Sequence, residues 1–211
     1  YRKQEKTVGI LAVDPTSPFS GGAFLGDRIR LGTHGVDKGV FIRSMASRGN
    51  TGGIARTTGD AINILDALGI EVILVETLGV GQGEVAVASV SDLTLIVLQP
   101  GIGDEVQMLK AGLLEVGNIY VVNKADIPGA KETAKHIQEM LVRSKSTHFS
   151  TPDQEKTDQV FRVIAKTGEG VNNLHDAIKE QVSSIKSNSI HMREKQKHRV
   201  TENLRLLLQE E

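Results

Sequence analysis

Short apolar runs, rich in β-branched and aliphatic residues, recur along the chain. They cover Val8–Val13, Val72–Val75, Leu93–Leu98, Ile119–Val122 and Val160–Ile164. None of them alternates apolar with polar positions, which is typical of strands buried on both faces of a parallel sheet. We therefore predict a strand in each of these ranges.

Helical periodicity fills the intervals between the runs. Apolar residues spaced by three and four positions predict helices with these stripes: Ile54, Ala61, Ile62, Leu65 and Leu68; Val106, Leu109, Leu113 and Val116; Ala130, Ala134, Ile137 and Leu141; Val171, Leu174, Ile178, Val182 and Ile185. Gly69 is predicted to cap the first of these helices. Strands that alternate with helices indicate βαβ units around one parallel sheet, so the predicted fold class is α/β.

Two polar segments depart from this pattern. Ser144–Lys156 contains Thr151-Pro152 and is predicted to be a surface loop. Ser187–Glu211 carries a basic patch followed by an apolar helical stripe: Arg193, Lys195, Lys197, His198 and Arg199, then Val200, Leu204, Leu207 and Leu208. This amphipathic tail has two interpretations, because it either packs on its own domain or forms an arm that contacts another subunit.

Composition narrows the classes of partner. The 211 residues carry a net charge of −1, so no overall field favours nucleic acid or a membrane surface as a partner. No apolar stretch approaches the roughly 20 residues that span a bilayer. The absence of cysteine excludes disulfides and thiolate metal sites and fits a reducing compartment. We expect a cytoplasmic location, or the mitochondrial matrix if the source is eukaryotic.

A polar tetrapeptide follows the predicted strand Ile119–Val122. In "IYVVNKADIPG" the run ends in Asn123, Lys124 and Asp126. Guanine presents N1–H and the exocyclic amine as adjacent donors, and one carboxylate accepts both in a bidentate pairing that adenine does not offer. Ligands of open α/β sheets bind at the carboxyl ends of the strands. The sequence therefore predicts a guanine site here, with an ordinary polar turn as the alternative.

Acidic residues follow two other predicted strands. In "VILVETLGVGQGE" the run ends in Glu76, and Gly79 would let a backbone N–H approach a phosphate. In "LAVDPTSPFSGGAFLGDRIRL" Asp14 follows a strand and Asp27 follows a Gly-rich turn. Carboxylates at strand ends hold hydrated Mg²⁺ beside nucleotide phosphates. The alternative is that these acids only cap turns and helix starts.

Two further Gly-rich stretches carry candidate functional residues. "SMASRGNTGGIART" places Arg48 among glycines before a helix, which suits a loop that closes over an anion or a plain connector. "PGIGDEVQMLKAG" places Gln107 and Lys110 away from the apolar stripe of its helix. The six histidines show no metal-ligand spacing and are expected to be solvated.

Together these stretches resemble the MeaB/ArgK-type P-loop GTPases, which are chaperones of adenosylcobalamin-dependent methylmalonyl-CoA mutase. The resemblance is carried by "LAVDPTSPFSGGAFLGDRIRL", "FIRSMASRGNTGGIART", "VILVETLGVGQGEVAVA" and "QPGIGDEVQMLKAGLLEVGNIYVVNKAD", and it covers residues 7 to about 182. It implies GTP/GDP and Mg²⁺ as cofactors, and that mutase or a related cobalamin-dependent acyl-CoA mutase as partner. It also implies a homodimer, with no role for nucleic acid or a membrane.

The resemblance assigns roles to individual residues. It implies that nucleotide is bound by Asn123, Lys124, Asp126, Ala165, Lys166 and Gly79, and metal by Asp14, Asp27 and Glu76. It implies switch or partner-sensing roles for Ser47, Arg48, Gly49, Gln82, Asp104, Gln107 and Lys110. No side chain is assigned as the catalytic base.

Two features depart from the family pattern. The phosphate loop G-x-x-x-x-G-K-[ST] is not found in the 211 residues, and Ile164 stands where many GTPases have Ser before Ala-Lys. We therefore expect a P-loop NTPase-type α/β fold that lacks its first strand and phosphate loop, with residues 1–186 as the GTPase domain and 187–211 as a helical arm. This reading makes the chain a fragment that is impaired in GTP binding.

Two alternative functions stay open at this point. One is a nickel-insertion GTPase, which metal titration would discriminate, and the absence of cysteine and of a His-rich tract argues against it. The other is an interaction module that binds no nucleotide.

Overall fold

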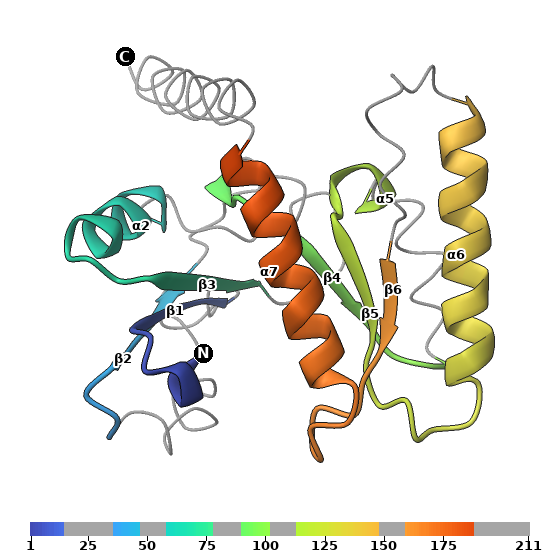
Figure 1. The fold of residues 1–211 in the computed structure, drawn as a ribbon, viewed down its shortest axis with the longest axis horizontal. Coiled ribbons are helices and arrows are strands. Elements are labelled where there is room, and N and C mark those ends of the chain that lie inside the picture. Colours follow the sequence, from blue (N-terminus) through green and yellow to red (C-terminus); the bar gives the residue numbers. More distant parts are fainter. Residues whose placement is uncertain (15–35, 47–57, 78–89, 102–112, 148–158, 188–211) are drawn as a thin grey trace. The chain divides into compact units, whose positions relative to one another are not determined.

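The computed structural model describes residues 1–14, 36–46, 58–77, 90–101, 113–147 and 159–187 (Figure 1). The chain forms two compact units, Tyr1–Val90 and Ser91–Glu211. In the part of the chain so described, every strand pairs in parallel. No helix there is long and apolar enough to cross a membrane.

The first unit is built on a three-stranded sheet. Its elements are the 3-10 helix η1 (Arg2–Gln4), the strands β1 (Val8–Asp14), β2 (Val40–Ala46) and β3 (Val72–Thr77), and the helix α2 (Thr58–Ala67). The order is β2-β1-β3. Helix α2 packs on the sheet through Ile62 and Leu65, which form a core with Leu11. Gly9 permits this approach, since a Cβ there would lie 2.9 Å from Leu65 Cδ1.

The end of α2 follows a defined capping geometry. The Ile70 N–H donates to the Leu65 carbonyl at 3.1 Å, and the Gly69 N–H donates to the Asp66 carbonyl at 2.9 Å. Gly69 has a φ of 78°, so the pattern is a Schellman motif and the predicted cap is confirmed. Leu68 was predicted to lie on the apolar stripe of this helix, and the structure corrects that prediction. That side chain follows the helix, which ends at Ala67, and is 72% exposed.

The second unit holds another three-stranded sheet, in the order β4-β5-β6. Its elements are β4 (Leu95–Leu98), α5 (Leu113–Val116), β5 (Ile119–Val122), α6 (Ala130–Thr147), β6 (Gln159–Arg162) and α7 (Val171–Ser187). Alternate residues of β5 serve opposite faces. Tyr120 packs with Ile137 of α6, and Ile119 packs with Leu174 of α7, so the two helices cover the two faces of the sheet (Figure 1).

The structure corrects several predicted elements. Strand β2 was not predicted, and β6 ends at Arg162 rather than at Ile164. Helix α6 continues to Thr147 and so takes in the first residues of the predicted surface loop. Pairing among the described strands forms two three-stranded sheets instead of one.

Burial on both faces is confirmed for β5, all of whose residues are buried, but it fails at two other strands. Leu74 of β3 is 44% exposed and Val97 of β4 is 59% exposed. Both residues belong to outer strands, since β3 and β4 have a paired neighbour on one side alone among the described strands.

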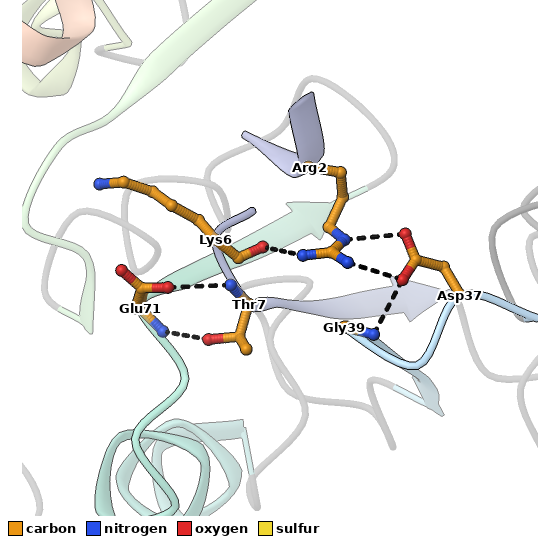
Figure 2. A network of polar contacts seen from close by, with 6 residues as sticks. All are labelled: Arg2, Lys6, Thr7, Asp37, Gly39 and Glu71. Atoms are coloured by element: carbon orange, nitrogen blue, oxygen red, sulfur yellow. Dashed lines mark hydrogen bonds and ion pairs between the residues drawn. The ribbon is translucent and has the colours of Figure 1, made fainter. Parts of the chain in front are cut away.

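Charged contacts fasten β1 to β2 at the amino ends of these strands (Figure 2). The Arg2 guanidinium donates through Nε and Nη2 to both carboxylate oxygens of Asp37, at 2.8 Å each. Arg2 Nη1 donates to the Lys6 carbonyl at 2.6 Å, and Asp37 Oδ1 also accepts the Gly39 N–H at 2.8 Å. The hydrogen bond to Asp37 raises the pKa of the Arg2 guanidinium, which therefore stays charged.

A second pair of contacts joins β1 to β3 at the same ends. The Thr7 N–H donates to Glu71 Oε2 at 3.0 Å, and the Glu71 N–H donates to Thr7 Oγ1 at 3.0 Å (Figure 2). The amino ends of the three strands are thus held by side chains. The carboxyl ends, where ligands bind in α/β proteins, lie at the opposite edge of the sheet.

Candidate guanine-nucleotide site

The turn after β5 brings the tetrapeptide Asn123–Asp126 to the carboxyl end of a fully buried strand. The Asn123 N–H still pairs with the Leu98 carbonyl at 2.8 Å, so the asparagine is held by the sheet. Lys124 has a φ of 56°, an uncommon value for a residue with a side chain. Residues with such uncommon backbone angles persist only where the surrounding structure holds them, and they are found most often at ligand sites.

The Asn123 amide joins this turn to the one that follows β6. Asn123 Oδ1 accepts the Lys124 N–H at 2.8 Å and the Ala165 N–H at 3.1 Å. Backbone pairs reinforce the connection, since the Ala125 N–H donates to the Val163 carbonyl and the Val163 N–H donates to the Val122 carbonyl. The structure therefore places two predicted nucleotide-binding segments side by side.

The second turn is shaped by its glycines. The Ile164 N–H donates to the Glu169 carbonyl at 2.9 Å, closing a loop that contains Ala165 and Lys166. Gly170 has a φ of 75°, and a Cβ there would lie only 2.3 Å from the Arg162 carbonyl oxygen. Glycine is therefore required at this position for the loop to keep its path.

The groups presented by these turns suit a guanine base. Asp126 is exposed, and no contact within the described residues engages its carboxylate. The Lys166 N–H has no acceptor among the described residues, whereas the Ala165 N–H is already used by Asn123. A carboxylate acceptor and a backbone donor match the donor edge and the carbonyl oxygen of guanine.

Two of the predicted metal ligands, Asp14 and Glu76, lie at the carboxyl ends of the neighbouring strands β1 and β3. Ala12 of β1 is in register with Ser44 of β2 and with Glu76 of β3, and Asp14 stands two positions beyond Ala12. Ser44 Oγ is buried and has no hydrogen-bond partner in the described part of the chain. A carboxylate and a buried hydroxyl without a partner on neighbouring strands suit a hydrated Mg²⁺, whose bound waters need acceptors and donors around them.

Several predicted site residues cannot be placed. Of Asp14 only the backbone is described. These residues lie outside the described ranges: Asp27, Ser47, Arg48, Gly49, Gly79, Gln82, Asp104, Gln107 and Lys110. In the described ranges, no three His, Asp or Glu side chains come together as a metal site.

Two residues of the site were not selected from the sequence. Ser44 belongs to β2, which lacks the continuous apolar run that identified the other strands. Gly170 follows Gly168 with one residue between them, and both have positive φ. A Gly-x-Gly pattern between a strand and a helix was the available signal for this turn.

The fold and the strand-end polar groups define a P-loop NTPase-type α/β protein. A crystal structure of LAO/AO transport system kinase matches with a TM-score of 0.70 and 22% identity, covering 99% of this chain and 60% of that one. HypB from Helicobacter pylori in complex with nickel matches with a TM-score of 0.56 and 12% identity, covering 86% and 78% of the two chains. At these identities, the likeness shows the fold alone.

The chain belongs to the MeaB family of methylmalonyl-CoA mutase-associated GTPases, whose family pattern matches residues 1–211. A Pyrococcus abyssi protein named as a GTPase is 43% identical over 207 residues, which are 98% of this chain and 63% of that protein. The mouse methylmalonic aciduria type A homolog, mitochondrial, is 32% identical over 94% of this chain and 48% of its own length. The fused isobutyryl-CoA mutase of Paraburkholderia xenovorans is 34% identical over 82% of this chain and 14% of its own length. The chain thus spans about half to two thirds of the first two of these relatives.

Proposed function

We propose that the protein binds and hydrolyses GTP and that guanine is read by the two joined turns after β5 and β6. The hydrogen bond from the Ala165 N–H to Asn123 Oδ1 carries this proposal. This bond fixes the turn after β5 relative to the loop after β6, and the two segments supply different groups to the base. Membership of a family of mutase-associated GTPases supports the same conclusion.

In this proposal, each group has a defined task. The Asp126 carboxylate accepts the N1–H and the exocyclic amine of guanine, and the Lys166 N–H donates to the base carbonyl. Asn123 Nδ2 remains as a donor for the other edge of the base, since its Oδ1 is engaged. The aliphatic stem of Lys124 lies over the ring. Adenine offers no matching pair of donors, so GTP is preferred over ATP.

The metal and phosphate region is assigned to the first unit. Asp14, Asp27 and Glu76 would hold Mg²⁺, with Ser44 as a partner for a bound water. When bound, Mg²⁺ neutralises the charge that develops on the phosphates during water attack. The residues of the chain position the phosphates and orient the attacking water, and no side chain has to form a covalent intermediate. Gly79 would give a backbone N–H access to the γ-phosphate.

Nucleotide state would be reported by three segments outside the described residues. They are Ser47–Gly49, the stretch that leads to Gln82, and the stretch that contains Asp104, Gln107 and Lys110. We assign them switch and partner-sensing roles.

The proposed partner is adenosylcobalamin-dependent methylmalonyl-CoA mutase or a related cobalamin-dependent acyl-CoA mutase. The protein would assist the loading or protection of the mutase cofactor. Support comes from the family description and from the relative named as a fused isobutyryl-CoA mutase. We further propose that the protein is a homodimer. Its proposed location is the cytoplasm, or the mitochondrial matrix if the source is eukaryotic.

Nucleotide selectivity tests the first part of this proposal. Calorimetric titration of the full-length protein with GTP and with ATP, each with Mg²⁺, should give at least tenfold tighter binding of GTP. A charge-assisted hydrogen bond contributes about 1.5–3 kcal/mol, which is tenfold or more in affinity. Equal affinities would contradict the proposed base-reading site.

The partner is tested separately. The GTP hydrolysis rate of the full-length protein is measured with and without purified adenosylcobalamin-dependent methylmalonyl-CoA mutase, and the two proteins are passed together over a sizing column. We expect a changed rate and co-elution. An unchanged rate without co-elution would contradict the partner while leaving nucleotide binding intact.

A further inference from the structure

Helix α2 carries an apolar pair outside the core that it forms with the sheet. Ile62 and Leu65 are buried, with exposures of 8% and 4%, whereas Ile64 and Leu68 are 60% and 72% exposed. The Leu68 N–H donates to the Ile64 carbonyl at 3.0 Å, so Leu68 still belongs to the last helical turn. Residues four positions apart are neighbours on a helix surface. The first unit thus presents an apolar pair that its described core does not use.

The charges around this pair have one sign. Every charged residue between positions 58 and 77 is acidic: Asp60, Asp66, Glu71 and Glu76. Asp60 and Asp66 are exposed, and Asp60 stands four positions before Ile64 on the same face of the helix. The residues Asp60, Ile64, Asp66 and Leu68 are called here the α2 face. It combines an apolar anchor with negative charge, and it fits a surface that combines apolar side chains with positive charge.

Helix α2 begins beside the carboxyl ends of the strands of the first unit. Its first residue, Thr58, is fully buried, and Thr58 Oγ1 donates to Met45 Sδ at 3.9 Å. Met45 is the neighbour of Ser44 on β2, and Ser44 belongs to the proposed metal region. A helix of ten residues is about 15 Å long. A partner bound to the α2 face therefore lies within one helix length of the residues assigned to Mg²⁺.

This inference rests on the mutase partner proposed above. We propose that the α2 face receives a segment of the mutase in which apolar and basic side chains share one surface. The apolar pair supplies the anchor, because buried apolar side chains at the centre of a contact carry most of its affinity. The acidic residues attract the basic segment and disfavour acidic partners. The net charge of −1 gives the whole chain little attraction of its own, so the attraction is local.

The test measures the affinity of the full-length protein for purified adenosylcobalamin-dependent methylmalonyl-CoA mutase by calorimetry. Leu68→Lys should weaken binding at least tenfold, since it removes an anchor and places a cation against a basic segment. Ile64→Lys should act in the same way. Val142→Lys is the matched control, because Val142 is 59% exposed on α6, and it should leave the affinity unchanged. Unchanged GTP affinity in all three variants shows that each is folded.

The acidic residues are tested separately from the apolar pair. Asp60→Asn combined with Asp66→Asn keeps the pair and removes two charges. Mutase association should become several-fold slower at low ionic strength and less sensitive to added salt, since rim charges act mainly on the association rate. A salt dependence equal to that of the wild type would overturn the assignment of a basic segment to this face.

The outcomes separate this inference from the proposed partner. Mutase that binds the wild type, Leu68→Lys and Ile64→Lys equally would overturn the inference and leave the partner standing. Mutase that does not bind the wild type would contradict the partner, and the inference would fall with it. Sedimentation of the same variants gives the remaining outcome. If Leu68→Lys alters self-association and leaves mutase binding unchanged, a second copy occupies the α2 face and the inference is overturned.

Discussion

Asn123 and Ala165 are separated by 42 positions in the sequence, yet Asn123 Oδ1 accepts the Ala165 N–H at 3.1 Å. The same oxygen accepts the Lys124 N–H at 2.8 Å. One amide therefore fixes the turn after β5 relative to the loop after β6. Any ligand that uses both turns depends on this bond.

Substitution of Asn123 separates the structural role of the side chain from its role in base reading. Asn123→Ala removes both accepted hydrogen bonds and should lower the free energy of unfolding by about 1–3 kcal/mol. Asn123→Asp keeps an oxygen that accepts both N–H groups, so its stability should stay near that of the wild type. It lacks the Nδ2 donor, however, and should bind GDP at least tenfold more weakly.

Urea unfolding and calorimetry with GDP measure the two effects. Equal loss of stability in Asn123→Ala and Asn123→Asp would show that the oxygen does not hold the turns together. Unchanged GDP affinity in Asn123→Asp would show that Asn123 Nδ2 does not contact the base.

Gly170 should tolerate no side chain. Gly170→Ala places a Cβ 2.3 Å from the Arg162 carbonyl oxygen at a φ of 75°, so it adds a steric clash to the conformational cost. Gly168→Ala is the matched control, because Gly168 has a φ of 85° but nothing within 4 Å of the added Cβ. We expect a loss of about 1 kcal/mol for Gly168→Ala and a clearly larger loss for Gly170→Ala. Similar unfolding midpoints for the two variants would contradict the role of the close approach.

The 211-residue polypeptide by itself should bind GTP weakly. It contains no G-x-x-x-x-G-K-[ST] sequence, which supplies backbone N–H donors, a lysine and a hydroxyl to the phosphates and Mg²⁺. Loss of even three charged hydrogen bonds removes roughly 5–9 kcal/mol. A micromolar site corresponds to about −8 kcal/mol, so at best millimolar affinity remains. Calorimetric titration of this polypeptide with GTP and Mg²⁺ measures the affinity. Micromolar binding would contradict the prediction and would mean that other residues of the chain bind the phosphates.

The regular elements of the second unit followed from the sequence because their core positions are apolar and evenly spaced. Ile137 and Leu141 on α6, and Leu174 and Ile178 on α7, pack as their periodicity predicts. Strand β2 escaped prediction because its exposed residues, such as Phe41 and Arg43, alternate with partly buried ones. An outer strand of that kind has no continuous apolar run to reveal it.

The residue types of the candidate site could be predicted from local sequence, but the hydrogen bonds that join its two turns could not. Asn123 and Asp126 attract notice because they end a buried strand. The bond to Ala165 depends on the pairing of β5 with β6, which local patterns do not specify. Leu68 fits the apolar stripe of α2, yet it is exposed because Gly69 ends the helix one residue later.

The central claim is that the Asp126 carboxylate selects guanine. Asp126→Asn in the full-length protein removes the bidentate acceptor and supplies an amide donor. Xanthine carries a carbonyl where guanine carries its exocyclic amine, so this variant should lose GTP affinity at least tenfold and gain affinity for xanthosine triphosphate. Calorimetric titration of wild type and variant with both nucleotides is the measurement. An exchange of preference from GTP to xanthosine triphosphate is the predicted result, and GTP binding that the substitution leaves unchanged would contradict the account.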